Sequence, residues 1–109
     1  MDDIFVKDRL KAVLEESIEF SKHATDNFIV RGFNRNDIIK LLKDTEKILE
    51  IEHQPDSKHG KKYKIWIEKS HKYNFVIVIN IINGKIRVVT FHLESSKRME
   101  KLRKWLKRK

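Results

Sequence analysis

The sequence predicts an α+β fold in which N-terminal helices pack on a four-stranded antiparallel sheet, followed by a basic C-terminal helix. Two β-rich runs, Tyr73–Ile82 and Lys85–Leu93, flank Asn83-Gly84 and predict the centre of the sheet. Asn-Gly is the strongest short hairpin signal because a type I′ turn needs positive φ at both central residues. The helices are predicted by apolar residues at three- and four-residue spacing, early in the chain and again at its end.

The length of 109 residues is enough for one small hydrophobic core, so a single domain is expected. Charged residues make up 38% and hydrophobic residues 39%, which suits a compact soluble protein. The absence of cysteine excludes disulfides and thiolate metal sites. No apolar run approaches the ~20 residues that span a bilayer. Because the start, Met1-Asp2-Asp3, is also unlike a signal peptide, we expect a cytoplasmic protein.

The formal net charge of +9 is concentrated at the C-terminal end of the chain. Residues 97–109 have a net charge of +7, which leaves +2 for the other 96 residues. The basic side chains of this stretch are Lys97, Arg98, Lys101, Arg103, Lys104, Lys107, Arg108 and Lys109. We expect an acidic partner, such as nucleic acid, to meet this end first.

Three helices are expected before the sheet. Residues 1–20 form an acidic amphipathic helix, whose exposed side carries six carboxylates against three basic residues. That side can pair with the basic end of the chain or remain solvated, since exposed ion pairs contribute only ~0–1 kcal/mol each. Ser21 is the expected N-cap of a helix over 22–31 that closes at Gly32. Asn34 is the expected N-cap of a helix over 35–44.

Four strands are expected after the helices: 48–53, 62–69 and the two strands of the hairpin. Leu49 and Ile51 are expected to point inward, and residues 54–61 with Pro55 are expected to form a loop. With a two-residue turn, the numbers of paired hairpin residues sum to 167. Matching apolar faces gives a sum of 142 between 62–69 and the first hairpin strand.

This register sorts the side chains of the sheet into two faces. One face is almost entirely apolar and is expected to be buried; on the hairpin it comprises Tyr73, Phe75, Ile77, Ile79, Ile81, Ile86, Val88, Thr90 and His92. His92 is therefore expected to be a hydrogen-bonded core histidine, with catalysis as the alternative. The other face holds a row of Lys62, Asn80 and Arg87 and a row of Trp66, Val76 and Phe91. This second face is the candidate functional surface.

The closing helix is expected over 94–109, with an apolar stripe of Met99, Leu102, Trp105 and Leu106. Trp66 and Phe91 can form the floor on which this stripe docks, or they can stack nucleobases. The first role is favoured, because the helix needs a surface on which to bury its stripe. A further alternative places the helix on an anionic membrane surface.

A motif follows the first helix. It begins with Ser21, His23 and Ala24, reaches Arg31-Gly32 eight residues after the histidine, and leads into the capped helix. A strand with Tyr63, an apolar strand and a last strand of Val-x-Thr type over 88–90 follow. In this order and spacing, residues 21–93 resemble an uncharacterised family of small proteins in the RelE/BrnT-type toxin-like superfamily. One departure is Asn27, where the family often has an arginine.

The resemblance implies a RelE-like fold with basic residues on a small antiparallel sheet. The wider superfamily includes ribosome-dependent or free endoribonucleases, usually held in check by a cognate antitoxin. The resemblance therefore implies RNA or the ribosome as a partner and an antitoxin as a second partner. The family most similar to this chain has no agreed activity, so the resemblance alone does not supply one.

RNA cleavage by attack of the 2′-hydroxyl needs a base, an acid for the leaving oxygen and cations near phosphorus, and needs no metal or other cofactor. The candidate catalytic residues are Lys62, Arg87, Lys64 and His23. A histidine near a helix N-terminus stays neutral more readily and can accept a proton. The cations can equally be solubilising residues, and His23 can make a structural hydrogen bond. The other histidines share no metal-ligand spacing, so no metal site is expected.

The sequence thus favours an RNA-interacting, toxin-like protein with metal-independent endoribonuclease activity as the sharper hypothesis. The residues expected to bind nucleic acid without catalysis are Arg98, Lys101, Arg103, Lys104, Lys107, Arg108 and Trp66. The alternative is a non-catalytic binding module whose basic tail contacts nucleic acid or an acidic partner protein.

Overall fold

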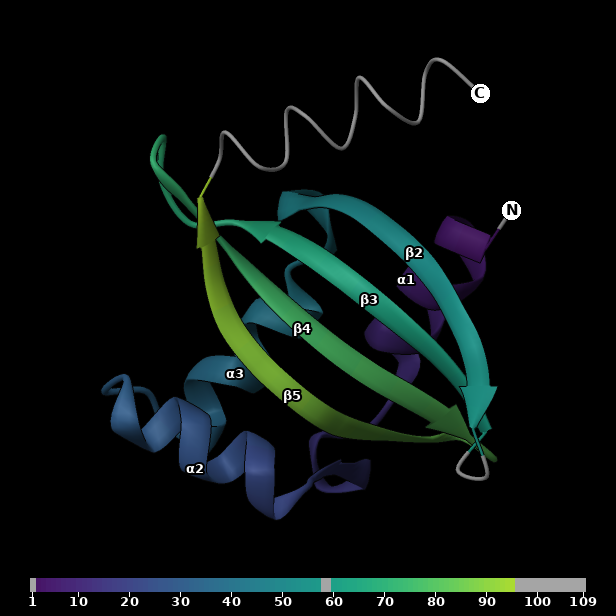
Figure 1. Cartoon of the computed structure of the whole chain (residues 1–109). Helices are drawn as coiled ribbons and strands as arrows, with labels where there is room; N and C mark the ends of the chain where they lie inside the picture. The colour runs from purple at the N-terminus through teal and green to yellow at the C-terminus, as the bar shows by residue number, and fades with distance from the viewer. Residues whose placement is uncertain (1, 58–59, 96–109) are drawn as a thin grey trace.

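The computed structural model describes residues 2–57 and 60–95 and has an α+β fold (Figure 1). Over these residues it contains α1 (Asp2–Ala12), α2 (Lys22–Val30), α3 (Arg35–Lys43) and two short 3₁₀ helices, Glu15–Ser17 and Thr45–Lys47. The strands are β1 (Ile18–Phe20), β2 (Ile48–Ser57), β3 (Gly60–Glu68), β4 (Tyr73–Ile82) and β5 (Lys85–Ser95). They form one five-stranded mixed sheet in the order β1-β5-β4-β3-β2.

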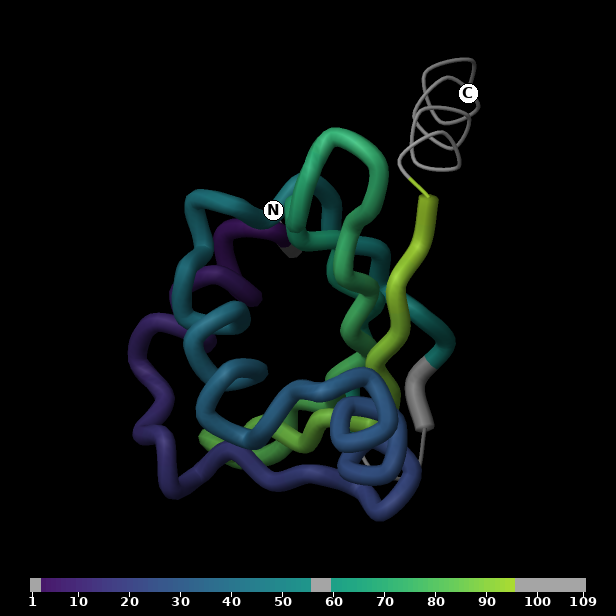
Figure 2. Tube along the Cα trace, turned by 90° about the vertical axis from the view of Figure 1, so that its left-hand side faces the viewer, coloured from purple at the N-terminus to yellow at the C-terminus, as the bar shows by residue number. Residues whose placement is uncertain are grey.

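The hydrophobic core lies between the sheet and the helices. Figure 1 looks onto the sheet with α1 and α3 behind it, and the turned view of Figure 2 places these helices to one side of the strands. Each helix contributes buried side chains to the core, for example Leu10 of α1, Phe28 of α2 and Leu42 of α3. In the part of the chain that the structure describes, no helix is long and apolar enough to cross a membrane.

The local signals for α2, α3 and the hairpin turn are confirmed. The Ser21 side chain accepts a hydrogen bond from the Ala24 amide at the start of α2. At the start of α3, Asn34 and Asp37 form a reciprocal capping box, which satisfies two amides that the helix leaves free. Asn83 and Gly84 have φ values of 42° and 79°, as a type I′ turn requires.

The predicted first helix is too long, and the predicted sheet lacks one strand. The helix ends at Ala12, and Ile18–Phe20 forms the edge strand β1, which pairs in parallel with Ile86–Val88 of β5. Where α1 ends, the Lys43 ammonium of α3 donates to the carbonyls of Leu10 and Val13 and so satisfies acceptors that the helix end leaves free. The sheet is therefore mixed and has five strands, whereas the sequence predicts four antiparallel strands.

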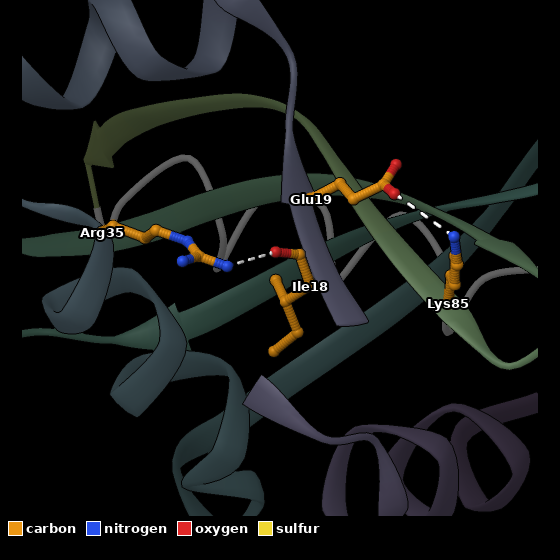
Figure 3. Close-up of polar contacts among 4 residues, drawn as sticks. All are labelled: Ile18, Glu19, Arg35 and Lys85. Carbon is orange, nitrogen blue, oxygen red and sulfur yellow. Dashed lines mark hydrogen bonds and ion pairs between the residues drawn. The ribbon is translucent and has the colours of Figure 1, made fainter. Parts of the chain in front are cut away.

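Contacts from two directions hold β1 in place (Figure 3). On the helix side, the Arg35 guanidinium donates to the Ile18 carbonyl at 2.8 Å. At the hairpin end, Glu19 forms an ion pair with Lys85, with 3.6 Å between Oε1 and Nζ. A three-residue strand makes few ladder bonds of its own, so these side-chain contacts supplement its pairing with β5.

Replacing Lys43 with methionine should lower the free energy of unfolding by about 1.5–3 kcal/mol, because hydrogen bonds from a charged donor to the end of α1 are lost. Thermal unfolding followed by circular dichroism measures this change. The matched control is Lys47→Met, since the Lys47 side chain is 64% exposed and forms an exposed ion pair with Asp44 at 3.9 Å. Equal stability of the two variants would show that Lys43 does not cap α1.

The strand β2 is longer than predicted, and it contains a bulge. It extends to Ser57 through Pro55, which the sheet tolerates because β2 is an edge strand whose register shifts between Gln54 and Ser57. A second shift lies between Ile48 and Glu50. As a result Ile48 joins the main core, whereas Leu49, which was predicted to point inward, packs beside Trp66 in a second small cluster.

A bulge in β5 changes the register of the hairpin halfway along. Paired numbers sum to 167 from the turn to Ile79 and Val88, as predicted, and then the partner of Val78 is Thr90. Two hydrogen bonds from Ser21 stabilise the bulge. Its amide donates to the Val88 carbonyl at 2.9 Å, and its hydroxyl donates to the Val89 carbonyl at 2.7 Å. One inserted residue exchanges the two faces of every later position in the strand.

Four predictions about the end of β5 are wrong. Thr90, which is predicted on the buried face, pairs with Val78 on the opposite face. Phe91 pairs with Ile77 and is fully buried in the main core, so it does not stand beside Val76. His92 pairs with Val76 on the opposite face, so it is not a core histidine. The predicted start of the last helix at Glu94 is also wrong, because β5 continues to Ser95. The remainder of that helix lies outside the described residues.

Candidate functional site

The candidate site is the face of the sheet opposite the main core, which we call the open face (Figure 1). The β3–β4 register agrees with the predicted sum of 142 throughout, so the predicted residues of β3 and β4 share this face. Its members on β3, β4 and β5 include Lys62, Lys64, Trp66, Glu68, Asn74, Val76, Val78, Asn80, Arg87, Thr90, His92 and Glu94. None of these positions belongs to the main core cluster. Five of them are nevertheless buried, namely Trp66, Asn74, Val76, Val78 and Asn80. The name open face therefore means only the side of the sheet opposite the main core.

The predicted row across three strands is confirmed. Lys62 of β3 pairs with Asn80 of β4, and Asn80 pairs with Arg87 of β5. Lys62 and Arg87 therefore lie on either side of the Asn80 side chain. Since neighbouring strands are ~4.8 Å apart, the backbones of the two cationic residues are about 10 Å apart. Asn80 is only 2% exposed, whereas both cations are half-buried and reach the surface. The row ends at Gln54 of β2 on one side and Glu19 of β1 on the other.

Lys64 lies one step along β3 from Lys62, at the boundary between the basic row and the apolar part of the open face. Its ammonium is 4.9 Å from the centroid of the Trp66 ring, a cation–π contact. Glu52 of β2 lies opposite it in the register. The structure therefore groups Lys62, Lys64 and Arg87, three of the four predicted catalytic residues, on one face.

The predicted role of Trp66 in base stacking does not fit its environment. The indole is only 3% exposed, and its Nε1 donates to the Glu94 carboxylate at 3.1 Å. It forms a small cluster with Val76 and Leu49. A nucleobase needs an uncovered ring face, so Trp66 acts here as a packing residue that holds the strands and orients Glu94.

His23 is not brought to the other predicted catalytic residues. It lies exposed on α2, the helix whose Ala24 and Phe28 join the main core, and the sheet separates that core from the open face. Its Nε2 shares a hydrogen bond with the side-chain amide of Asn27 at 3.1 Å. The structure thus gives His23 the local hydrogen bond that was the alternative to catalysis.

His92 is the histidine that the open face does contain, and sequence reasoning missed it. A signal was present in the alternation of β5, where the apolar positions are 86 and 88 before the bulge but 91 and 93 after it. A change of phase within one strand requires an inserted residue. His92 lies beside Val76, and the next pair on the same face is Val78 with Thr90, two positions along the strands.

Acidic side chains border the basic row. Glu50 and Glu52 of β2 lie opposite Trp66 and Lys64, and Glu68 and Glu94 lie at the far end of the face, on either side of Asn74. Within residues 2–57 and 60–95, no three His, Asp or Glu side chains are grouped so that they could hold a metal ion. The predicted nucleic-acid contacts Arg98, Lys101, Arg103, Lys104, Lys107 and Arg108 lie outside the described residues.

Comparisons of the chain with protein-family models, with curated proteins and with solved structures found no match. The likeness to the toxin-like superfamily therefore remains a prediction from sequence. Any function has to be argued from the geometry of the open face and from the charge of the chain.

Proposed function

We propose that this protein binds RNA and that the open face contacts the sugar-phosphate backbone. The observation that carries the proposal is the row in which Lys62 and Arg87 flank Asn80 on three adjacent strands. A guanidinium and an ammonium bind phosphate oxygens with charge-assisted hydrogen bonds, and backbone contacts of this kind supply most of the affinity for nucleic acid.

Two further observations support RNA as the ligand. The net charge of +9 favours a polyanion, and residues 97–109 supply +7 of it. The resemblance of residues 21–93 to toxin-like proteins favours RNA or the ribosome over DNA. An antitoxin or another acidic protein is the alternative partner, and it would also be drawn to a basic surface.

The location of the contact can be tested by NMR. A ¹⁵N-labelled full-length protein is titrated with a short unstructured RNA, and the amide shifts are followed. We expect the largest shifts at Lys62, Asn80, Arg87 and their neighbours on the open face, together with shifts in the basic C-terminal stretch. Shifts confined to the C-terminal stretch, or to α2, would contradict a role for the open face.

A second candidate function is RNA cleavage, because the bulge places His92 on the same face as Lys64 and Arg87. In the proposed step, a histidine base removes the proton of a 2′-hydroxyl and its oxygen attacks the adjacent phosphorus. The P–O5′ bond breaks, leaving a 2′,3′-cyclic phosphate, and the departing 5′-oxygen takes a proton from a water molecule to become a 5′-hydroxyl. Lys64 pairs with Val78, two positions from the partner of His92, and would stabilise the charge on the phosphoryl oxygens. Arg87 lies four register positions from His92, about 13 Å along the strands, and would contact a neighbouring phosphate.

If cleavage occurs, His92→Gln should slow it about 100-fold or more, since general base catalysis contributes ~10²–10⁴-fold. The matched control is His23→Gln, which should retain the wild-type rate because His23 lies on α2. Cleavage of labelled RNA in the presence of EDTA, with and without ribosomes, measures both rates. If only the His23→Gln variant loses activity, His23 is the catalytic base, as predicted from the sequence. If no RNA is cleaved under any condition, the protein binds RNA without cleaving it.

A further inference from the structure

The two faces of the sheet differ at the end where the chain leaves β5. There Ser95, the last residue of β5, pairs with Tyr73, and Leu93 pairs with Phe75. On the open face this end is polar and carries Glu68, Asn74 and Glu94. On the core side it is apolar, and several large side chains reach the surface: Phe33, Leu41, Tyr73 and Leu93.

A cleft of about 430 Å³ lies on the core side of this end. It is bounded by α3 and the ends of β3 and β4, and its apolar lining is formed by Phe33, Leu41, Ile67 and Phe75. Two carboxylates and two lysines also line it, so their formal charges cancel; they are Asp37, Lys40, Asp44 and Lys47. The cleft therefore selects its occupant by apolar contact and not by charge.

The segment that follows Ser95, residues 96–109, has the apolar stripe of Met99, Leu102, Trp105 and Leu106 and lies outside the described residues. The floor predicted for this stripe was Trp66 with Phe91. These two side chains belong to separate clusters on opposite faces of the sheet and are only 3% and 0% exposed. The stripe therefore needs a different apolar surface.

The cleft is within reach of this segment. Ser95 lies two positions, about 7 Å, beyond the pair of Leu93 with Phe75. Three residues separate Ser95 from Met99, a span of at most ~14 Å, so the stripe can turn back onto the cleft. A tether this short gives the segment an effective concentration on the order of millimolar. A separate partner would have to compete with that concentration.

We propose that residues 96–109 dock in this cleft of their own chain, with Trp105 against Phe33 and Leu41. An aromatic side chain of this kind buries ~150–250 Å². Helical residues three or four positions apart share a face, so Met99 and Leu102 would follow Trp105 onto the core side and leave the basic side chains pointing outward. The proposal does not depend on RNA binding, and it leaves those basic side chains able to contact RNA.

Paramagnetic relaxation enhancement in the full-length ¹⁵N-labelled protein tests the proposal. The chain has no cysteine, so a nitroxide can be attached at a single position, Lys40→Cys, beside the cleft. We expect strong broadening of the amides of residues 99–106 and of the Trp105 indole. The matched control is a nitroxide at Glu52→Cys, an exposed position on the open face, which should broaden these signals only weakly.

Two substitutions test the apolar contact. Trp105→Ala and Leu41→Glu should each remove most of the broadening caused by the nitroxide beside the cleft. The control Leu14→Glu should leave it unchanged, because Leu14 is 63% exposed and does not line the cleft. Leu41 also packs against the main core, so the Trp105→Ala variant decides the outcome if Leu41→Glu does not fold.

Four results would overturn the proposal. The first is no broadening of residues 99–106 from either nitroxide. The second is equal or stronger broadening from Glu52→Cys, which would place the segment on the open face. The third is undiminished broadening in the Trp105→Ala variant. The fourth is the same broadening when the nitroxide and the ¹⁵N label are on different molecules, which would show that the segment docks on a second copy of the chain.

Discussion

Replacing Phe91 with alanine should lower the free energy of unfolding by about 3–5 kcal/mol, the cost of removing a large aromatic side chain from a packed core. Phe91 is fully buried, and its ring lies 5.5 Å from those of both Phe33 and Phe75. Urea unfolding followed by circular dichroism measures the change. Because the effect is a large fraction of the stability of a small domain, the variant should be partly unfolded at moderate temperature.

The neighbouring variant His92→Ala is the matched control for this prediction. His92 is on the open face, so its removal should cost only about 1 kcal/mol or less. Without the bulge in β5, the two side chains would exchange faces, and the ranking of the two variants would reverse. A larger loss of stability for His92→Ala than for Phe91→Ala would therefore show that the register does not shift.

The double variant Lys62→Ala/Arg87→Ala should bind RNA about 30- to 150-fold more weakly than the wild type near 100 mM salt, since each lost charge-assisted contact contributes about 1–1.5 kcal/mol. The two side chains reach the surface from either side of Asn80, so neither is expected to replace the other. Fluorescence anisotropy with a labelled RNA gives the affinities. Unfolding curves of both proteins establish that the fold is kept.

A second double variant separates a local contact from an effect of net charge. Lys22→Ala/Arg31→Ala also removes one lysine and one arginine, and both residues are exposed on α2 or at its end. Because both residues lie away from the open face, the α2 variant should bind RNA within about threefold of the wild type, although the two double variants have the same formal charge. If both weaken binding equally, the protein attracts RNA only through its overall charge.

The parts of the fold that sequence predicted well depend on local chemistry. The Asn83-Gly84 turn adopts its conformation because of those two residues, and it fixes the register of the nearest pairs up to Ile79 and Val88. The caps Ser21 and Asn34 likewise act within one helical turn. The Lys62–Asn80–Arg87 row follows from the register on each side of β4, so this part of the candidate site could be predicted.

The parts that could not be predicted depend on contacts between distant residues. Ile18 fits a helical stripe as well as a strand, and its pairing with Ile86 is set by the sheet. The bulge is held by Ser21, which is 68 positions from Val89, so its location depends on where α2 begins. His92 was assigned to the wrong face for this reason.

The central claim is that Lys62 and Arg87 contact phosphates, and the salt dependence of RNA binding tests it most directly. The slope of log K against log [salt] should be shallower by about 1.4 in the Lys62→Ala/Arg87→Ala variant than in the wild type, because each phosphate contact on a single strand contributes ~0.7. The α2 double variant should keep the wild-type slope. An unchanged slope in the Lys62→Ala/Arg87→Ala variant would show that the open face does not contact RNA.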